Sequence, residues 1–162
     1  MSNTSYLMAV LLMIATMSPS VLFAQSATSR YVVTGINSTV TEMPDGTTVD
    51  ESTYLQVGMT DAPDFPYYND IIFECTGKAV AGADGALISS DGMCRGVSSE
   101  GDFASFWWRA DEAGTDSCPT QCGTWGSVNG TGKYKDKEVS GTWKGVTATP
   151  AGSFGTATMT VK

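Results

Sequence analysis

The sequence contains no histidine and few basic residues, and each shortage excludes a class of function. Nine Lys and Arg residues stand against 17 Asp and Glu residues, which gives a net charge of −8 over 162 residues. Nucleic-acid backbones are bound mainly through Lys and Arg, so we predict no nucleic-acid partner. Without histidine the chain cannot form a Ser-His-Asp triad, a Cys-His dyad or a histidine-ligated zinc site. Any catalysis would have to use carboxylates, Tyr, Lys, Cys or a bound metal, and we predict neither a metal site nor a cofactor.

The chain also lacks an apolar run long enough to cross a membrane as a helix. The run at residues 7–17 has 11 residues, whereas a bilayer core of about 30 Å needs about 20. With Pro19 and Ala24 behind it, this run fits the apolar region of a secretory signal peptide. We predict that residues 1–24 are removed after Ala24, with Ala27 as the second choice, and that the mature protein is secreted or periplasmic without a membrane span. Because no Lys or Arg precedes the run, a retained anchor is the alternative.

Residues 25–162 carry all 18 glycines, and beyond residue 28 no stretch has sustained helical periodicity. Runs of period-two alternation, rich in Val, Thr and aromatic residues, recur instead. Glycine-containing turn signals, such as Pro44-Asp45-Gly46 and Asp84-Gly85, separate these runs. We predict an all-β fold: a single domain at 25–162 that forms a small, closed antiparallel β-barrel of about eight strands, stapled by disulfides. The candidate strands are 30–34, 47–59, 70–80, 86–97, 102–110, 123–128, 139–147 and 156–161.

The Asp84-Gly85 pair predicts one hairpin in detail. If these residues are the centre of a two-residue type I′ turn, Glu74 faces Arg95 and Lys78 faces Asp91 on one side of the sheet. The other side then places Cys75 opposite Cys94. An apolar group on that same side is expected to contain Ala79, Ala81, Ala86 and Ile88.

Four cysteines follow the predicted signal peptide, in a compartment where disulfides persist. They allow three pairings. We prefer Cys75–Cys94, from the hairpin register, together with Cys118–Cys122, over the crossed pairings. The spacing of Cys118 and Cys122 is also that of a metal or redox motif, but neither histidine nor a second such cluster accompanies it.

The segment GTWGSVNGTGKYKDKEVSGTW at residues 123–143, with Gly92-Met-Cys-Arg-Gly and Glu100-Gly-Asp, resembles exported bacterial proteins of the allene oxide cyclase barrel-like superfamily. The resemblance covers about residues 70–145. It implies a closed antiparallel barrel of about eight strands, and the plant enzymes of this superfamily cyclise an unsaturated epoxide fatty acid inside theirs. Their catalytic residues are not found in the matching segment. Residues 135–138 are more charged than the usual tight turn, and the Cys118–Cys122 loop resembles an insertion.

Aromatic residues supply the material for a ligand pocket, since concave sites are mostly apolar with a few placed polar groups. Alternation along 103–110 places Phe106, Trp108 and Ala110 on one face of the strand and Ser105, Trp107 and Arg109 on the other. The alternative is that these aromatics only fill the core. We assign the candidate ligand pocket to Tyr54, Trp107, Trp108, Arg109, Trp125 and Trp143.

Two groups of carboxylates are weaker candidates. Glu74 follows an apolar run that would raise its pKa toward that of a general base, but the hairpin register pairs it with Arg95 on the outside. The acidic segment from Asp61 and Asp64 to Asp70 offers oxygens for calcium without the spacing of an EF-hand. We expect both groups to be structural or solvated.

Three classes of function fit these features. The first is an exported barrel that binds a small apolar ligand in or at the mouth of the barrel. The second is an isomerase or cyclase that acts on a lipid-like substrate by holding a reactive conformer inside the barrel. The third is a structural or interaction protein of the cell envelope with a solid barrel. The volume of the cavity separates the third from the others, and a buried, unpaired Glu, Asp or Tyr in it separates the second from the first.

Overall fold

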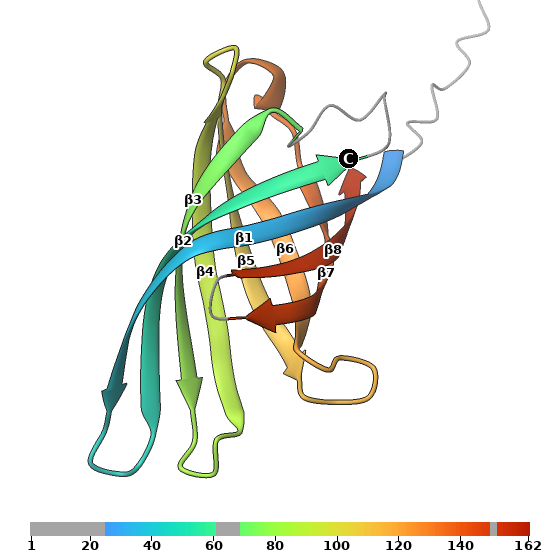
Figure 1. Ribbon diagram of the computed structural model, residues 1–162. Helices are drawn as coiled ribbons and strands as arrows, with labels where there is room; N and C mark the ends of the chain where they lie inside the picture. Colours follow the sequence, from blue (N-terminus) through green and yellow to red (C-terminus); the bar gives the residue numbers. More distant parts are fainter. Residues whose placement is uncertain (1–24, 61–68, 150–151) are drawn as a thin grey trace, which may run out of the picture.

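The computed structural model describes residues 25–60, 69–149 and 152–162, and they form a closed antiparallel barrel in which every strand pairs with its neighbours in chain order (Figure 1). The last strand pairs back onto the first, so the sheet has no free edge. The predicted all-β fold with about eight strands is confirmed. The strands are β1 (Gln25–Glu42), β2 (Thr48–Thr60), β3 (Ile71–Ala81), β4 (Leu87–Ser98), β5 (Phe103–Ala113), β6 (Gln121–Gly130), β7 (Val139–Thr149) and β8 (Gly152–Val161).

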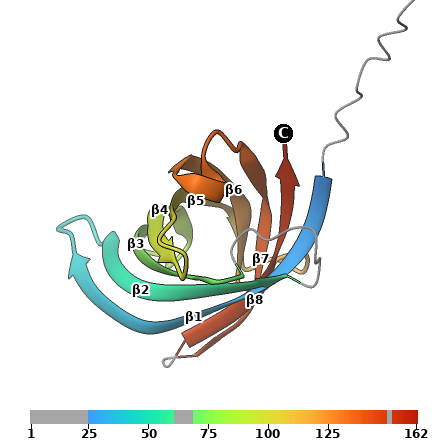
Figure 2. The same cartoon turned by 90° about the horizontal axis from the view of Figure 1, so that it is seen from above.

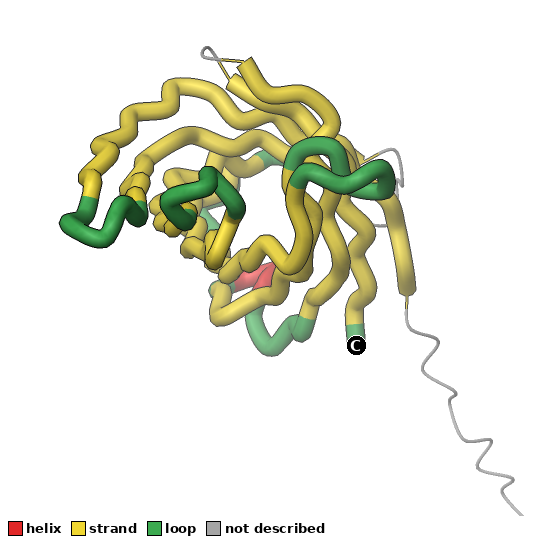
Figure 3. The backbone as a smooth tube through the Cα atoms, turned by 90° about the horizontal axis from the view of Figure 1, so that it is seen from below, coloured by secondary structure: helices red, strands yellow, loops and turns green. Residues whose placement is uncertain are grey.

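Side chains alternate between the interior and the solvent as the period-two pattern predicts. In β3, Ile71, Phe73 and Cys75 are buried, whereas Ile72 and Glu74 between them are exposed. The buried residues form a core at one end of the barrel, where a 3-10 helix, η1 (Gly132–Tyr134), follows β6. Figure 3 looks along the ring of strands from the opposite end, with η1 beyond it. The core residues are Ile71, Phe73, Cys75, Cys94, Ala104, Phe106, Trp125, Tyr134, Val139 and Met159.

The first strand is much longer than the predicted 30–34. β1 pairs with β8 over Gln25–Thr34 and with β2 over Ser29–Glu42, so it curves around the barrel and contacts two neighbours in succession (Figure 2). A bulge lies between Thr34 and Asn37, and Gly35 adopts a φ of 64° within it. Since a positive φ is costly for residues with a Cβ, glycine permits this bend. The polar stretch after Gly35 concealed the continuation of the strand.

The predicted β3–β4 register is confirmed: Glu74 lies opposite Arg95, Cys75 opposite Cys94 and Lys78 opposite Asp91. The predicted turn is wrong. Gly85 has a positive φ but Asp84 does not, and the Gly82 N–H donates to the Ala86 carbonyl, which makes a three-residue loop. A bulge beside Val80 then shifts the pairing by one residue and restores the expected register.

The expected apolar group at the tip of this hairpin is also wrong. The bulge on β4 turns Ile88 outward, where 62% of it is exposed, and Ala86 is exposed in the loop. The side-chain alternation that placed them inside assumed an unbroken ladder as far as the turn.

Both predicted disulfides are present. Cys75 and Cys94 are buried and join β3 to β4, while Cys118 and Cys122 close a short loop between β5 and β6. All cysteines are thereby paired. Among the described residues there is no helix with the length and apolarity that a membrane-crossing helix needs.

Polar contacts close the end of the barrel at η1. The Lys133 ammonium lies 2.8 Å from Asp70 Oδ2 and 3.3 Å from Glu100 Oε2, and the Tyr134 hydroxyl donates to Asp70 Oδ1 at 3.2 Å. The Lys133 N–H donates to Asp102 Oδ2. These contacts fasten η1 to the start of β3 and to the β4–β5 turn, so the core end of the barrel is covered.

Candidate functional site

A cavity of about 290 Å³ occupies the barrel interior beyond the core. It exists because residues facing the interior in one register row are small: Ala79 pairs with Ser90, Ser90 with Ala110, and Ala110 with Gly123. The next interior row contains two glycines, Gly77 and Gly92, in adjacent strands. Because an eight-stranded barrel is only just wide enough for its side chains to fill, the row of small residues leaves space for the cavity, while the two glycines leave room for the Trp108 ring.

Large aromatic side chains from other strands surround this space. Trp108 and Trp143 pack edge to face with ring centroids 5.9 Å apart. Deeper in the barrel, Phe106 makes edge-to-face contacts with Phe73 and with Trp125, at 4.9 and 5.6 Å. The aromatic residues that line the cavity are Tyr31, Tyr54, Phe73, Phe106, Trp108, Trp125 and Trp143.

The cavity also contains polar groups that lack partners. One oxygen of Asp50, Oδ1, and the indole Nε1 of Trp108 are buried without a hydrogen-bond partner in the part of the chain that the structure describes. Buried polar atoms are nearly always hydrogen-bonded, so these two atoms are exceptions among the residues that line the cavity.

Two tyrosines of the cavity are displaced from their usual titration range. Burial raises the pKa of Tyr31 and of Tyr54 above the ordinary value of a phenol. At Tyr54 the neighbouring Trp108 N–H acts in the opposite direction, although its geometry falls short of a hydrogen bond. Both phenols therefore stay neutral and can donate a proton in a hydrogen bond to a ligand.

The structure brings together four of the six residues assigned to the pocket from sequence. Tyr54, Trp108, Trp125 and Trp143 line the cavity. Trp107 lies on the outer face, 38% exposed, with its indole over Gly126 of the neighbouring strand.

Arg109 also lies outside, where its Nε donates to Asp111 Oδ1 at 2.8 Å. The alternation expected for residues 103–110 is therefore present: Trp107 and Arg109 lie on the outer face of β5, and Phe106 and Trp108 lie on the inner face.

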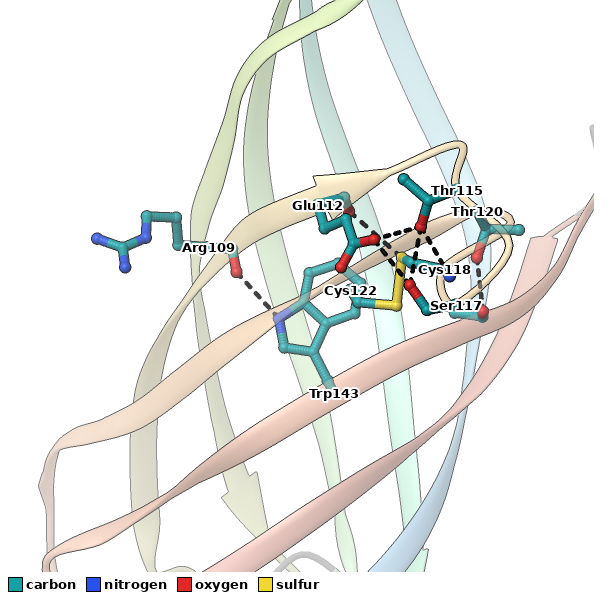
Figure 4. The surroundings of a disulfide bond; sticks show 9 residues. Arg109, Glu112, Thr115, Ser117, Cys118, Thr120, Cys122 and Trp143 are labelled. Atoms are coloured by element: carbon teal, nitrogen blue, oxygen red, sulfur yellow. Dashed lines mark hydrogen bonds between the residues drawn. A yellow bond between two sulfur atoms is a disulfide. The ribbon is translucent and has the colours of Figure 1, made fainter.

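Figure 4 shows the β5–β6 loop with the second disulfide, Cys118–Cys122, and its neighbour Trp143. Gln121, next to Cys122, lines the cavity, and the Trp143 Nε1 donates to the carbonyls of Arg109 and Thr124, both at 3.2 Å. These bonds fix the Trp143 indole against the strands that carry the loop. The disulfide therefore constrains a segment at the wall of the cavity.

Glu112 organises the same loop from its outer side. Its Oε1 accepts hydrogen bonds from the hydroxyls of Thr115 and Ser117, and these bonds lower the pKa of Glu112. Its backbone carbonyl contacts the Cys118 sulfur.

The carboxylates weighed from sequence have other positions. Glu74 is exposed on the outer face opposite Arg95. Asp61 and Asp64 lie outside the described residues, and Asp70 binds Lys133, Ser99 and Tyr134. Within residues 25–60, 69–149 and 152–162, no group of three or more Cys, Asp or Glu side chains is placed to hold a metal ion.

Asp50 and Tyr31 were not singled out from the sequence. The signal was present in β2, where every second residue from Asp50 to Gly58 faces the cavity: Asp50, Ser52, Tyr54, Gln56 and Gly58. When every second residue of a strand is polar, that face normally points to solvent. The mostly polar row in β2 therefore predicts an outward face, whereas the structure turns it toward the cavity.

Comparison with protein-family models and with curated proteins gave no match. Among solved structures, the chain is similar to a pterocarpan synthase dirigent protein, at 14% sequence identity over 93% of this chain and 98% of that chain, with a TM-score of 0.47.

Proposed function

We propose that this protein is an exported barrel that binds a small apolar ligand in its interior. The observation that carries the proposal is the 290 Å³ cavity, lined by seven aromatic residues. Ligand sites are typically concave, mostly apolar and equipped with a few polar groups that fix orientation, which describes this cavity. A barrel with a purely structural role would gain stability from filling the same space, since interiors are normally close-packed.

Export is part of the proposal and is supported by the cysteines. All four form disulfides, which persist in oxidising compartments and are rare in reducing ones. A secreted or periplasmic location and a signal peptide at residues 1–24 fit this chemistry. Membership in the exported allene oxide cyclase-like group is proposed on the sequence motifs.

A second candidate, an isomerase or cyclase acting within the barrel, is favoured by one observation. Asp50 places a carboxylate oxygen without a partner in the cavity, close to where a bound molecule would lie. A positioned carboxylate can transfer a proton, and a shaped cavity can hold a reactive conformer. Ligand binding is common to both candidates, and turnover distinguishes them.

Binding of a neutral aromatic fluorophore, N-phenylnaphthylamine, tests the main proposal. We compare wild type with Ser90→Phe, which fills the cavity, and with Ser89→Phe, the neighbouring exposed position on the other face of β4. We expect saturable binding by wild type and Ser89→Phe and loss of binding by Ser90→Phe, with near-ultraviolet circular dichroism confirming that each variant is folded. Equal binding by the three proteins, or none by wild type, contradicts an interior site.

A further inference from the structure

Asp50 is the charged residue of the inner face of β2, and its surroundings offer it no counter-charge. It pairs in register with Val40 on β1 and Ala79 on β3, both uncharged. It takes part in none of the ion pairs formed within the described residues, and its Oδ1 is buried without a hydrogen-bond donor. This oxygen is therefore available to accept a hydrogen bond from a cationic group of a ligand.

Lys78 also reaches the edge of the cavity, but it belongs to the outer row of β3. It is exposed, and it faces Glu51 on β2 and Asp91 on β4. Two acids flank its charge and water screens it, so Lys78 is not a counter-ion directed into the barrel.

Aromatic rings supply the second feature. Tyr54, Trp108 and Trp143 line the same cavity as Asp50, and the Trp108 and Trp143 rings meet at an interplanar angle of 89°. Faces of Trp and Tyr carry negative charge density and attract cations, an attraction that grows when water is excluded. A carboxylate among such rings suits an organic ammonium ion better than a neutral molecule or an anion.

From this geometry we infer that the cavity selects ligands with an ammonium group on an apolar body, with Asp50 as the counter-ion. The inference rests on the ligand-binding function proposed above and specifies the chemistry of the ligand. The net charge of −8 acts in the same direction, because a negative protein attracts cations to its openings. A fatty acid anion, which the superfamily resemblance would suggest, is disfavoured by Asp50.

The test compares three probes that share an apolar body and differ in charge: phenylbutylamine, phenylbutanol and phenylbutyrate. Titration calorimetry at neutral pH measures the dissociation constant of each with the wild-type mature protein. We expect the amine to bind about tenfold or more tightly than the alcohol, and the acid to bind most weakly. Equal binding of amine and alcohol, or tightest binding of the acid, overturns the inference while the ligand-binding function stands. Binding of none of the three overturns both.

Asp50→Asn keeps the shape of the side chain and removes its charge, so it should bring the amine and the alcohol to equal affinity. The matched control is Asp91→Asn, which changes the net charge equally on the outer face and should retain the preference of wild type. If Asp91→Asn loses the preference as fully as Asp50→Asn, selectivity comes from the overall field of the protein and the assignment to Asp50 is wrong. Should Asp50→Asn fail to fold, the probe series on wild type still decides whether cations are preferred.

Discussion

The indole of Trp108 lies directly over Gly92, its register partner on β4: a Cβ at Gly92 would come within 2.6 Å of Trp108 Nε1. On the next strand, a Cβ at Gly77 would lie 2.9 Å from Trp108 Cζ2 and 3.2 Å from the Ser52 hydroxyl. The Trp108 ring thus packs directly against two adjacent glycines, Gly77 and Gly92. The position of Trp108, and with it the shape of the cavity, depends on the absence of two side chains.

Gly77→Ala should displace Trp108 and destabilise the barrel by about 1–3 kcal/mol, the usual cost of adding a methyl group to packed surroundings. Unlike Gly92, whose missing Cβ would lie 2.2 Å from the Thr76 carbonyl oxygen, Gly77 meets only side chains, so the variant should fold. Urea denaturation measures the free energy of unfolding, and near-ultraviolet circular dichroism reports on the ring. Thr76→Ala, exposed on the other face of β3, is the control. Unchanged stability and an unchanged spectrum would show that Trp108 is not held by this contact.

The two disulfides should contribute unequally to stability. Loss of Cys75–Cys94, with a sequence separation of 19, should cost about 2–4 kcal/mol, because the constraint on the unfolded chain grows with loop length. Loss of Cys118–Cys122, with a separation of 4, should cost less. The double alanine variants, compared by denaturant titration, measure both effects. A larger loss from the 118–122 pair would mean that its loop is needed to complete the barrel.

Stability should fall in acid partly through Asp70. The Lys133 ammonium, bound to this carboxylate, holds the pKa of Asp70 below its ordinary value, with further hydrogen bonds from Ser99 and Tyr134. The contribution is therefore present above the unfolded pKa of about 3.9 and is lost as the pH falls through the folded pKa. Because the pair is partly exposed, it should amount to about 1 kcal/mol or less.

Asp70→Asn should accordingly be less stable than wild type at neutral pH, and the difference should shrink toward zero below about pH 3. Asp116→Asn, at an exposed position of the β5–β6 loop, controls for the change in net charge. A difference that stays constant across the whole pH range would show that charge on Asp70 is not what fastens η1.

Trp107 and Trp108 are neighbours in sequence and should differ in their response to a soluble quencher. Trp107 faces solvent, whereas Trp108 is half-buried against the glycines. Acrylamide should therefore quench the emission of Trp108→Phe, which retains Trp107, more strongly than that of Trp107→Phe. The reverse order would contradict the assignment of the two faces of β5.

The sequence was sufficient to predict the strands and the β3–β4 register with its Cys75–Cys94 disulfide, because these depend on local alternation and on a turn. Closure into a barrel was predicted from the glycine content and the family resemblance, and Cys118–Cys122 as the pairing that remained. The predicted β3–β4 register is correct even though the predicted turn is wrong. The three-residue loop shifts the pairing by one residue, and the bulge beside Val80 shifts it back. The cavity was harder to predict. Asp50 belongs to a polar alternate row that usually faces solvent, and only closure of the sheet turns that row inward. Trp107 was assigned to the pocket because composition does not reveal which face of an aromatic strand is covered.

The seam between β1 and β8 has a consequence for how the chain can be rearranged. Gln25 pairs with Val161, so the two ends of the barrel segment lie side by side, while all other strand pairs join neighbours in sequence. We expect closing this seam to be the slow step of folding, since it brings together residues far apart along the chain. A circular permutant that joins Lys162 to Gln25 by a short linker and opens the exposed loop at Asp84 would turn that step into a local hairpin. The permutant would keep every strand pairing, and its two chain ends would lie at the β3–β4 pair instead of the β1–β8 pair. We therefore expect the same barrel, with its strands joined in a different order.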